Sequence, residues 1–125
     1  CLLQLRGFRI MTWEVVFSAQ VTSWIAELDQ DQRNSLFTAV DLLRDFGPHL
    51  DRPYVGKIVG SELKNMKELR PLSNSVVHLR VLFAFDPDRR AVLLVAGDKT
   101  GQLNKWYKKQ MPIAEEIYRR FREQP

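Results

Sequence analysis

Apolar and polar residues in the first third of the chain follow two different patterns. Residues 12–17 (T-W-E-V-V-F) are rich in β-branched and aromatic types, which favours a strand. Ser18 then stands where a helix N-cap is expected. Apolar residues recur every three or four positions over residues 21–28 and again from Leu36, which predicts two amphipathic helices separated by the polar segment 29–31. We expect an antiparallel helical hairpin whose stripes lie in the core; the second stripe is Leu36, Phe37, Val40, Leu43 and Phe46.

The middle of the chain predicts a long loop followed by strands. Gly47 and Pro48 end the second helix, and residues 47–65 show no sustained period, so they form a long loop with at most a short helical or strand piece. Such loops are often functional. Residues 66–70 and 76–85 predict strands, and 91–96 predicts a third, buried strand that forms an antiparallel hairpin with 76–85. We expect Gly97 to end that strand.

The C-terminal segment is helical in period, with Pro112 expected in the first turn of the last helix. The order of elements predicts an α+β domain, in which a small, mostly antiparallel sheet packs against an N-terminal helical hairpin and carries a C-terminal helix. We assign residues 11–125 to this domain and residues 1–10 to an N-terminal extension, with Met11 as a candidate start.

Composition and charge narrow the class of protein. A chain of 125 residues, 45% hydrophobic, can bury a core without a metal or disulfide, and Cys1 is its single cysteine. No apolar run approaches the ~18 residues of a membrane span, and we expect a cytoplasmic protein. The formal net charge of +4 is divided into +2 over residues 1–11, −4 over residues 12–50 and +6 over residues 51–125. A polyanion should therefore meet the C-terminal half.

Common catalytic motifs are absent from the sequence. There is no glycine-rich phosphate loop, no metal-ligand set and no nucleophile elbow, so we predict no cofactor and no metal. His49 falls in the loop and His78 inside a predicted strand, far apart in the chain. A histidine in a strand is more often a packed residue than a catalyst.

Charged residues at strand positions are the first candidates for a site. Glu68 and Arg70 are two positions apart and share a face of their strand, whereas Lys67 points to the other face. Arg80 lies in the middle of a strand, where a charge needs an acidic or phosphate partner. Glu68 on the neighbouring strand can supply that partner, as a cross-strand ion pair.

Cations and aromatic residues alternate after the last strand, at Lys99, Lys105, Trp106, Tyr107 and Lys108. Single-stranded RNA suits such a mixture, because cations bind its phosphates and aromatic rings stack on its bases. The alternative is that Trp106 and Tyr107 anchor the tail in the core while the lysines form a solvated face. The sequence leaves both interpretations open.

Four segments carry a resemblance to a known family: L-K-N-M-K-E-L-R-P (63–71), R-V-L-F-A-F-D-P-D-R-R-A (80–91), A-G-D-K-T-G (96–101) and K-W-Y-K-K-Q-M-P-I-A-E-E-I-Y (105–118). Over residues 12–122 the chain resembles the phage-derived, HigB-like branch of the RelE/ParE toxin superfamily. The resemblance implies a toxin of a type II toxin–antitoxin pair that cleaves mRNA without metal, generally on the ribosome, and so inhibits translation. The partner it implies is a helix-turn-helix antitoxin, which covers either the basic surface or the acidic helical hairpin. Alternatives are a ParE-like toxin, which inhibits DNA gyrase by binding, and an inert relative that only regulates.

The resemblance also suggests roles for individual residues. The mid-strand arginine falls on Arg80, the cation of the preceding strand on Lys67 or Arg70, the cation after the last strand on Lys99, and the aromatic hydroxyl on Tyr107. Glu68 could be the base in this branch, although RelE itself lacks such a glutamate and has a shorter spacing between the last two groups. The catalytic candidates are Glu68, Arg70, Arg80, Lys99 and Tyr107, and the RNA-binding candidates are Lys57, Lys64, Lys67, Lys105, Trp106 and Lys108.

Overall fold

The computed structural model describes residues 12–71 and 78–124, and every structural statement below refers to this part of the chain. It is an α+β structure built on one sheet with strand order β1-β5-β4-β3-β2, in which only the β1–β5 pair is parallel. The strands are β1 (Glu14–Phe17), β2 (Val55–Lys57), β3 (Met66–Leu69), β4 (Leu79–Phe85) and β5 (Arg90–Asp98), and the helices are α1 (Ala19–Ile25), α2 (Gln30–Phe46) and α3 (Leu103–Glu123), with a 3-10 turn at Gly47–His49. The predicted fold class is confirmed. The expected extension at residues 1–10 and the start of the strand predicted at residue 76 lie outside the described residues.

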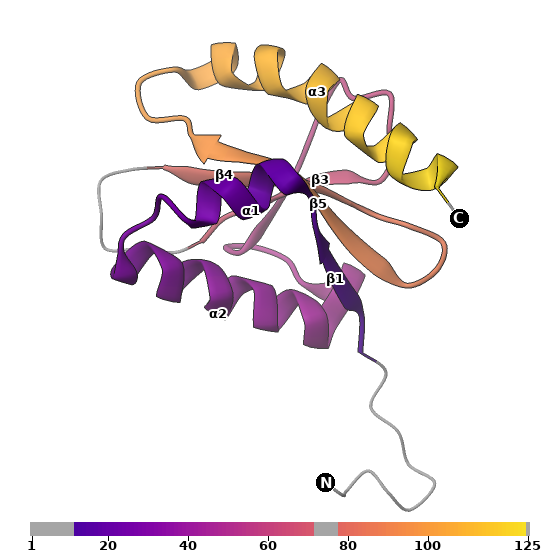
Figure 1. Ribbon diagram of the computed structural model, residues 1–125, viewed down its shortest axis with the longest axis horizontal. Helices are drawn as coiled ribbons and strands as arrows, with labels where there is room; N and C mark the ends of the chain where they lie inside the picture. The colour runs from indigo at the N-terminus through magenta and orange to yellow at the C-terminus, as the bar shows by residue number, and fades with distance from the viewer. Residues whose placement is uncertain (1–11, 72–77, 125) are drawn as a thin grey trace, which may run out of the picture.

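Helices cover both faces of the sheet (Figure 1). The antiparallel pair α1 and α2 lies on one side and α3 on the other. Side chains of the central strand β4 alternate between the two cores: Val81 and Phe83 pack toward α1 and α2, whereas Leu82 and Ala84 pack toward α3. The near-continuous apolar sequence of β4 therefore reflects burial on both faces.

Side-chain caps set the boundaries of the helical hairpin. Ser18 Oγ accepts a hydrogen bond from the Val21 amide at 3.1 Å, which confirms the predicted N-cap of α1. The polar break between the helices supplies a capping box, in which Asp29 Oδ1 accepts the Gln32 amide and Gln32 Oε1 accepts the Asp29 amide. The Arg33 side chain of α2 links the two helices by donating hydrogen bonds to the carbonyl oxygens of Ile25 and Leu28.

A β-bulge in β5 directs the chain toward α3. Leu82 pairs with Val95 and Phe83 with Leu93, so Leu94 is an extra residue in β5, and both Leu94 and Val95 face α3. Beyond the bulge the strand continues through Gly97 to Asp98, so the expectation that Gly97 ends it is wrong. A Cβ atom at Gly97 would lie 2.9 Å from Trp106 Nε1, which shows that the glycine leaves room for this indole.

Several further expectations need correction. Pro112 lies inside α3 and not in its first turn, because Leu103–Met111 is already helical and is held to the sheet by the buried Trp106. His78 precedes β4 and is not inside a strand. The long loop, by contrast, agrees with the prediction, because the short strand piece that it allowed is the edge strand β2, which pairs with β3.

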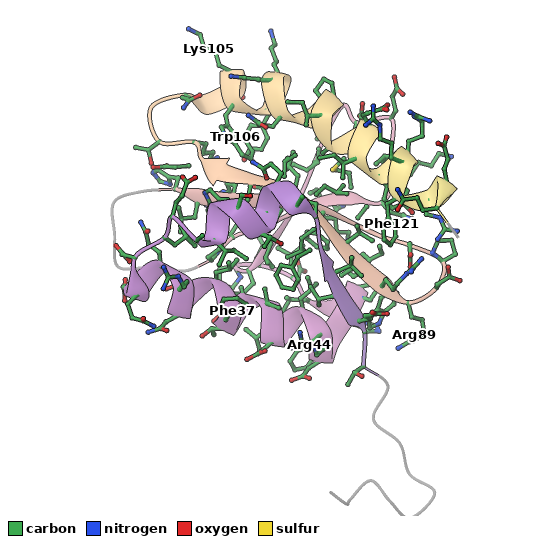
Figure 2. The ribbon with its side chains drawn as sticks, viewed as in Figure 1. Phe37, Arg44, Arg89, Lys105, Trp106 and Phe121 are labelled. Carbon is green, nitrogen blue, oxygen red and sulfur yellow. The ribbon has the colours of Figure 1, made fainter. Side chains whose placement is uncertain are left out.

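The apolar stripe of α2 is only partly buried. Leu36, Val40 and Leu43 are in the core as predicted, but Phe37 and Phe46 are 41% and 53% exposed. The core thus takes up a narrower face of the helix than the stripe occupies. Phe37, labelled on α2 in Figure 2, lies near Phe17 of the edge strand β1, with ring centroids 6.3 Å apart. Within the described ranges no helix combines the length and the apolar character that crossing a membrane requires.

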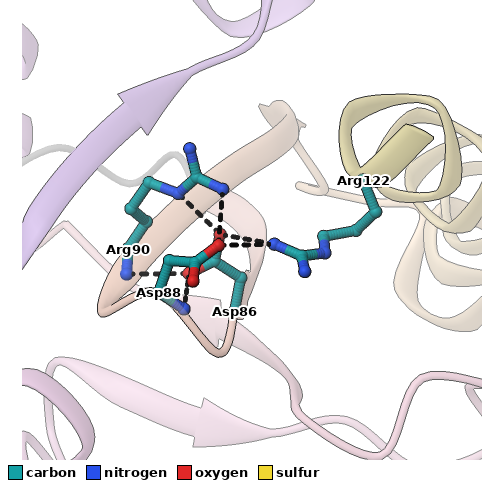
Figure 3. A network of polar contacts seen from close by, with 4 residues as sticks. All are labelled: Asp86, Asp88, Arg90 and Arg122. Atoms are coloured by element: carbon teal, nitrogen blue, oxygen red, sulfur yellow. Dashed lines mark hydrogen bonds and ion pairs between the residues drawn. The ribbon is translucent and has the colours of Figure 1, made fainter. Parts of the chain in front are cut away.

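An ionic network holds the end of α3 against the β4–β5 turn (Figure 3). The fully buried Asp86 carboxylate accepts the Asp88 and Arg90 amides through Oδ1, both at 2.9 Å. Its Oδ2 accepts Arg90 Nε at 2.6 Å and Arg122 Nη1 at 3.3 Å. The Arg90 guanidinium also lies 4.6 Å from the centroid of the Phe121 ring. Asp86 thus accepts hydrogen bonds both from the backbone amides of the β4–β5 turn and from Arg122 in the last turn of α3.

We predict that Asp86→Ala lowers the free energy of unfolding by about 3 kcal/mol, because it removes the buried acceptor and leaves two amides and two guanidinium groups short of a partner. Urea denaturation followed by circular dichroism measures this change. Asp88→Ala is the matched control, since the Asp88 side chain is 64% exposed, and it should cost less than ~1 kcal/mol. Equal losses for the two variants would contradict the central position given to Asp86.

Candidate active site

Two adjacent strands present charged side chains to the face of the sheet that α3 covers. Glu68 lies on β3 opposite Leu82 of β4, and Leu82 packs into the core beneath α3. Strand alternation places Arg70 and Arg80 on this same face and Lys67 on the opposite one, as the sequence predicts. Of these two cations, Arg70 contacts Glu68, whereas Lys67 lies on the opposite face of the strand.

Glu68 is the centre of the site. Its side chain is only 3% exposed, and Arg70 donates to Oε2 from Nε and Nη2, both at 2.8 Å. Tyr107 Oη donates to Oε1 at 2.5 Å, and Arg80 Nε lies 3.8 Å from the same oxygen. The predicted cross-strand ion pair between Glu68 and Arg80 is therefore present, with Arg70 as the closer cation.

The Arg70 side chain lies over Gly56 of the edge strand β2, which pairs with Glu68. A Cβ atom at Gly56 would lie 2.3 Å from the Arg70 guanidinium, so the absence of a side chain at Gly56 gives Arg70 its place. The Arg70 amide is held by the Tyr54 carbonyl at 2.7 Å. The long loop thus contributes directly to the site, because its strand β2 carries the glycine over which Arg70 lies.

Lys99 and Tyr107 come together although eight residues separate them. Lys99 Nζ donates to Tyr107 Oη at 3.0 Å and lies 5.0 Å from the centroid of its ring. The turn before α3 positions Lys99: Asp98 Oδ1 accepts the Thr100 amide and hydroxyl, and the Lys99 amide donates to the His78 carbonyl. His78 therefore contributes its backbone to this turn.

Burial and charge shift two of these groups. Burial, the hydrogen bond to Glu68 and the negative charge of Glu68 raise the pKa of Tyr107 to about 12. Burial lowers the pKa of Lys99, and the charges of Arg80 and Arg70 lower it further against the opposing attraction of Glu68. At neutral pH the Tyr107 hydroxyl is therefore protonated and donates its hydrogen bond to Glu68.

Arg80 differs from Arg70 in its surroundings. Its side chain is 15% exposed, and Nη1 donates to the Leu79 carbonyl at 2.8 Å. Its Nε is buried and has no hydrogen-bond partner among the described residues. A buried guanidinium donor without a hydrogen-bond partner is costly. The Arg80 Nε–H group, next to Glu68, can therefore still donate one hydrogen bond.

A cavity of about 660 Å³ opens above these groups, between strand β3, the segment that follows β2 and α3. This volume lies in the usual range for small-molecule sites. Four of the five predicted catalytic residues line it, namely Glu68, Arg70, Lys99 and Tyr107, and so do the predicted RNA-binding residues Lys57 and Lys108. Arg80 lies beside the cavity through its contact with Glu68.

Other predicted RNA-binding residues lie elsewhere. Trp106 cannot stack on a base as predicted, because it is only 4% exposed and packs in the core beside Gly97. For Trp106 the core alternative is confirmed, and Figure 2 shows its neighbour Lys105 pointing away from the sheet. Lys64 and Lys105 are exposed and do not line the cavity.

The sequence interpretation missed part of the cavity wall. Met111, Pro112 and Glu115 line it from α3, and Ile58 lines it from the segment after β2. The signal for the α3 residues was available, because positions 107, 111 and 115 are four apart and share one face of a helix. In the described ranges, no group of three or more His, Cys, Asp or Glu side chains is arranged to hold a metal ion.

Solved structures with the same fold include Escherichia coli toxin RelE, as a double arginine-to-alanine mutant in the free state. It has a TM-score of 0.58 and 13% sequence identity, covering 81% of this chain and 99% of that one. The archaeal RelE–RelB complex from Pyrococcus horikoshii OT3 matches with a TM-score of 0.58 and 19% identity, covering 74% of this chain and 99% of that one. At these identities the likeness concerns the fold alone.

Sequence relatives are closer. The chain is 46% identical over 102 residues to "Putative toxin HigB3" of Mycobacterium tuberculosis, covering 82% of this chain and 87% of that protein. It is 40% identical over 99 residues to "Putative toxin HigB2" of the same organism, covering 79% of this chain but only 49% of that relative, so it spans about half of the second protein's length. The family model for "Phage derived protein Gp49-like (DUF891)" matches residues 23–119. The chain therefore belongs to the Gp49-like family of phage-derived proteins and has a RelE-like fold.

Proposed function

We propose that this protein is the toxin of a type II toxin–antitoxin pair and that it inhibits translation by cleaving mRNA without a metal cofactor. Two relatives bear the name of HigB toxins, and the fold is that of RelE. The observation that carries the proposal is the cavity in which Glu68, Tyr107, Lys99 and Arg70 contact one another. It combines a proton acceptor, a proton donor and cations, as RNA transesterification requires.

The proposed reaction is attack of an RNA 2′-oxygen on the adjacent phosphorus. Glu68 takes the proton of the 2′-hydroxyl while the new P–O2′ bond forms. The P–O5′ bond breaks, and the leaving 5′-oxygen takes a proton from Tyr107, which Lys99 replaces through the existing Lys99–Tyr107 hydrogen bond. The products are a 2′,3′-cyclic phosphate and a 5′-hydroxyl. General acid and base groups of this kind typically contribute about 10²–10⁴-fold each.

Cations stabilise the phosphorane oxygens in this proposal. Arg70 presents its guanidinium at the cavity wall and can bind two phosphate oxygens at once, as a bidentate donor. Arg80 Nε lies 3.8 Å from Glu68 Oε1 and has no hydrogen-bond partner among the described residues. An incoming phosphate can accept a hydrogen bond from this guanidinium when Glu68 moves toward the 2′-hydroxyl. Preorganised donors at a developing anion are usually the largest single contribution to such catalysis.

The proposed partners are mRNA, on the ribosome, and a cognate antitoxin of helix-turn-helix type. The solved RelE–RelB complex from Pyrococcus horikoshii, which shares this fold, supports a protein partner for this chain. The antitoxin can occlude the basic cavity or bind the acidic hairpin α1–α2, which lies on the opposite face of the sheet. No observation on the described residues favours the gyrase-binding alternative over RNA cleavage.

We predict that purified protein, supplied with ribosomes where required, cleaves mRNA in the presence of a chelator and leaves 2′,3′-cyclic phosphate or 3′-phosphate ends. The reason is that Glu68, Tyr107 and Arg70 supply the base, the acid and the charge. Primer extension locates the cuts, and end-specific ligation or kinase treatment identifies the termini. Ribosome integrity in chelator is controlled separately. Products with 3′-hydroxyl ends, or strict metal dependence, would contradict the mechanism.

Glu68→Gln should lower single-turnover cleavage by about 10²–10⁴-fold, because an amide cannot take the 2′-hydroxyl proton. The shape is nearly identical, but the change removes the charge that pairs with Arg70 and Arg80, so the melting temperature should fall. Cleavage is therefore compared at a temperature at which circular dichroism shows both proteins to be folded. The matched control is Glu27→Gln, which removes an exposed carboxylate that does not line the cavity. Wild-type cleavage by Glu68→Gln would remove Glu68 from the chemistry.

The pH dependence of Tyr107 gives a further test. Its neutral form is favoured by burial and by Glu68, so it stays protonated up to its pKa of about 12. The difference in ultraviolet absorbance between wild type and Tyr107→Phe should show no tyrosinate at pH 10, the ordinary midpoint of a tyrosine. The factor by which Tyr107→Phe lowers the cleavage rate should likewise be the same at pH 7 and at pH 9. A midpoint near pH 10 in the difference spectrum would contradict the effect of burial and of Glu68 on this hydroxyl.

A further inference from the structure

The two ends of the cavity differ in chemistry. Lys99, Arg70 and Tyr107 occupy one end, where the proposed reaction takes place. The rest of the lining, called the second end below, comprises Met111, Pro112 and Glu115 further along α3 and Ile58 and Glu62 after β2, with the cations Lys57 and Lys108 beside them. We propose that this second end is a subsite for the nucleobase of a nucleotide next to the cleaved phosphate. The inference rests on the proposed function and extends it to substrate recognition.

The spacing along α3 fits one nucleotide. Met111 follows Tyr107 by four residues, so it lies on the same face of the helix, about 6 Å further along the axis. A base attached to a ribose whose phosphate lies at Tyr107 spans a comparable distance. The partly buried Met111 thioether is a flexible, polarisable surface that suits the face of an aromatic ring.

The opposite wall of this end is held in place by Glu115. Its Oε2 accepts the Ser61 hydroxyl and the Glu62 amide, both at 2.8 Å. Ser61 Oγ in turn accepts the Leu63 amide at 3.0 Å. These bonds fasten the segment that carries Ile58 to the α3 turn that follows Met111 and Pro112. The space between the two walls is therefore formed before substrate binds.

Charge decides which part of a nucleotide enters this end. A phosphate is favoured beside Lys99 and Arg70, whereas at the second end the carboxylates of Glu62 and Glu115 offset the charges of Lys57 and Lys108. A base presents a flat apolar face to Met111 and Ile58, and its amino groups can donate to a carboxylate at the rim, as cytosine N4 does to acidic residues. Flipped or single-stranded bases are commonly bound between apolar side chains in this way.

The test compares RNA substrates that carry an abasic residue on either side of the cleaved bond. Wild-type kcat/KM should fall about tenfold for one of the two abasic substrates, the effect typical of lost contacts in an apolar pocket. Met111→Ala should lose about the same factor on ordinary RNA and nothing more on that abasic substrate. The matched control is Ile113→Ala on the same helix, which is 42% exposed, does not line the cavity and should behave as wild type.

A binding measurement separates this inference from the proposed function. A 2′-deoxy dinucleotide cannot be cleaved, and it should shift the NMR signal of the Met111 methyl group more strongly than its abasic counterpart. If RNA is not cleaved at all but this difference is seen, the proposed function fails and the subsite stands. Equal cleavage of ordinary and both abasic RNAs would overturn the subsite. It would also be overturned if Met111→Ala weakened binding of a co-expressed antitoxin and left cleavage of every RNA unchanged, since the wall would then belong to the protein partner.

Discussion

The buried carboxylate of Glu68 is the interaction on which the arrangement of the site depends. A charged group with 3% of its side chain exposed is costly unless it is paired and hydrogen-bonded. Its partners come from three places: Arg70 follows β3, Arg80 lies on β4, and Tyr107 lies on α3. Satisfying Glu68 therefore requires the sheet and α3 to be assembled together. The same contacts place an acceptor, a donor and cations within one cavity.

Two anchors hold α3 across the sheet so that Tyr107 can meet Glu68. Near its N-terminus, Trp106 fills the space that Gly97 leaves at the end of β5. Near its C-terminus, Arg122 pairs with Asp86 of the β4–β5 turn. The cavity lies along the helix between these points, on a face of α3 next to the one whose Ala114 and Ile117 pack in the core. The structure thus separates what holds the helix from what lines the site.

Much of the fold follows from local pattern. The apolar periods predict both N-terminal helices, Ser18 marks a cap, and the α+β order of elements is confirmed. Strand alternation alone places Glu68 and Arg70 on one face and Lys67 on the other. Side chains of a strand alternate between its two faces whatever strands lie beside it, so the sequence is enough to predict this. The motifs around Glu68, Arg80 and Lys99 also carried the resemblance that led to the catalytic candidates.

The sequence by itself determined which elements form and which faces their side chains share, since both are properties of consecutive residues. Only the tertiary structure decided which elements meet. It brings Tyr107 to Lys99 and Glu68, but it buries the adjacent Trp106 in the core, a distinction that composition left open. It also makes Met111 part of the cavity wall. The physical reason is that these outcomes depend on how α3 rotates and docks on the sheet, and that rotation is set by long-range packing at Trp106 and the pairing of Arg122.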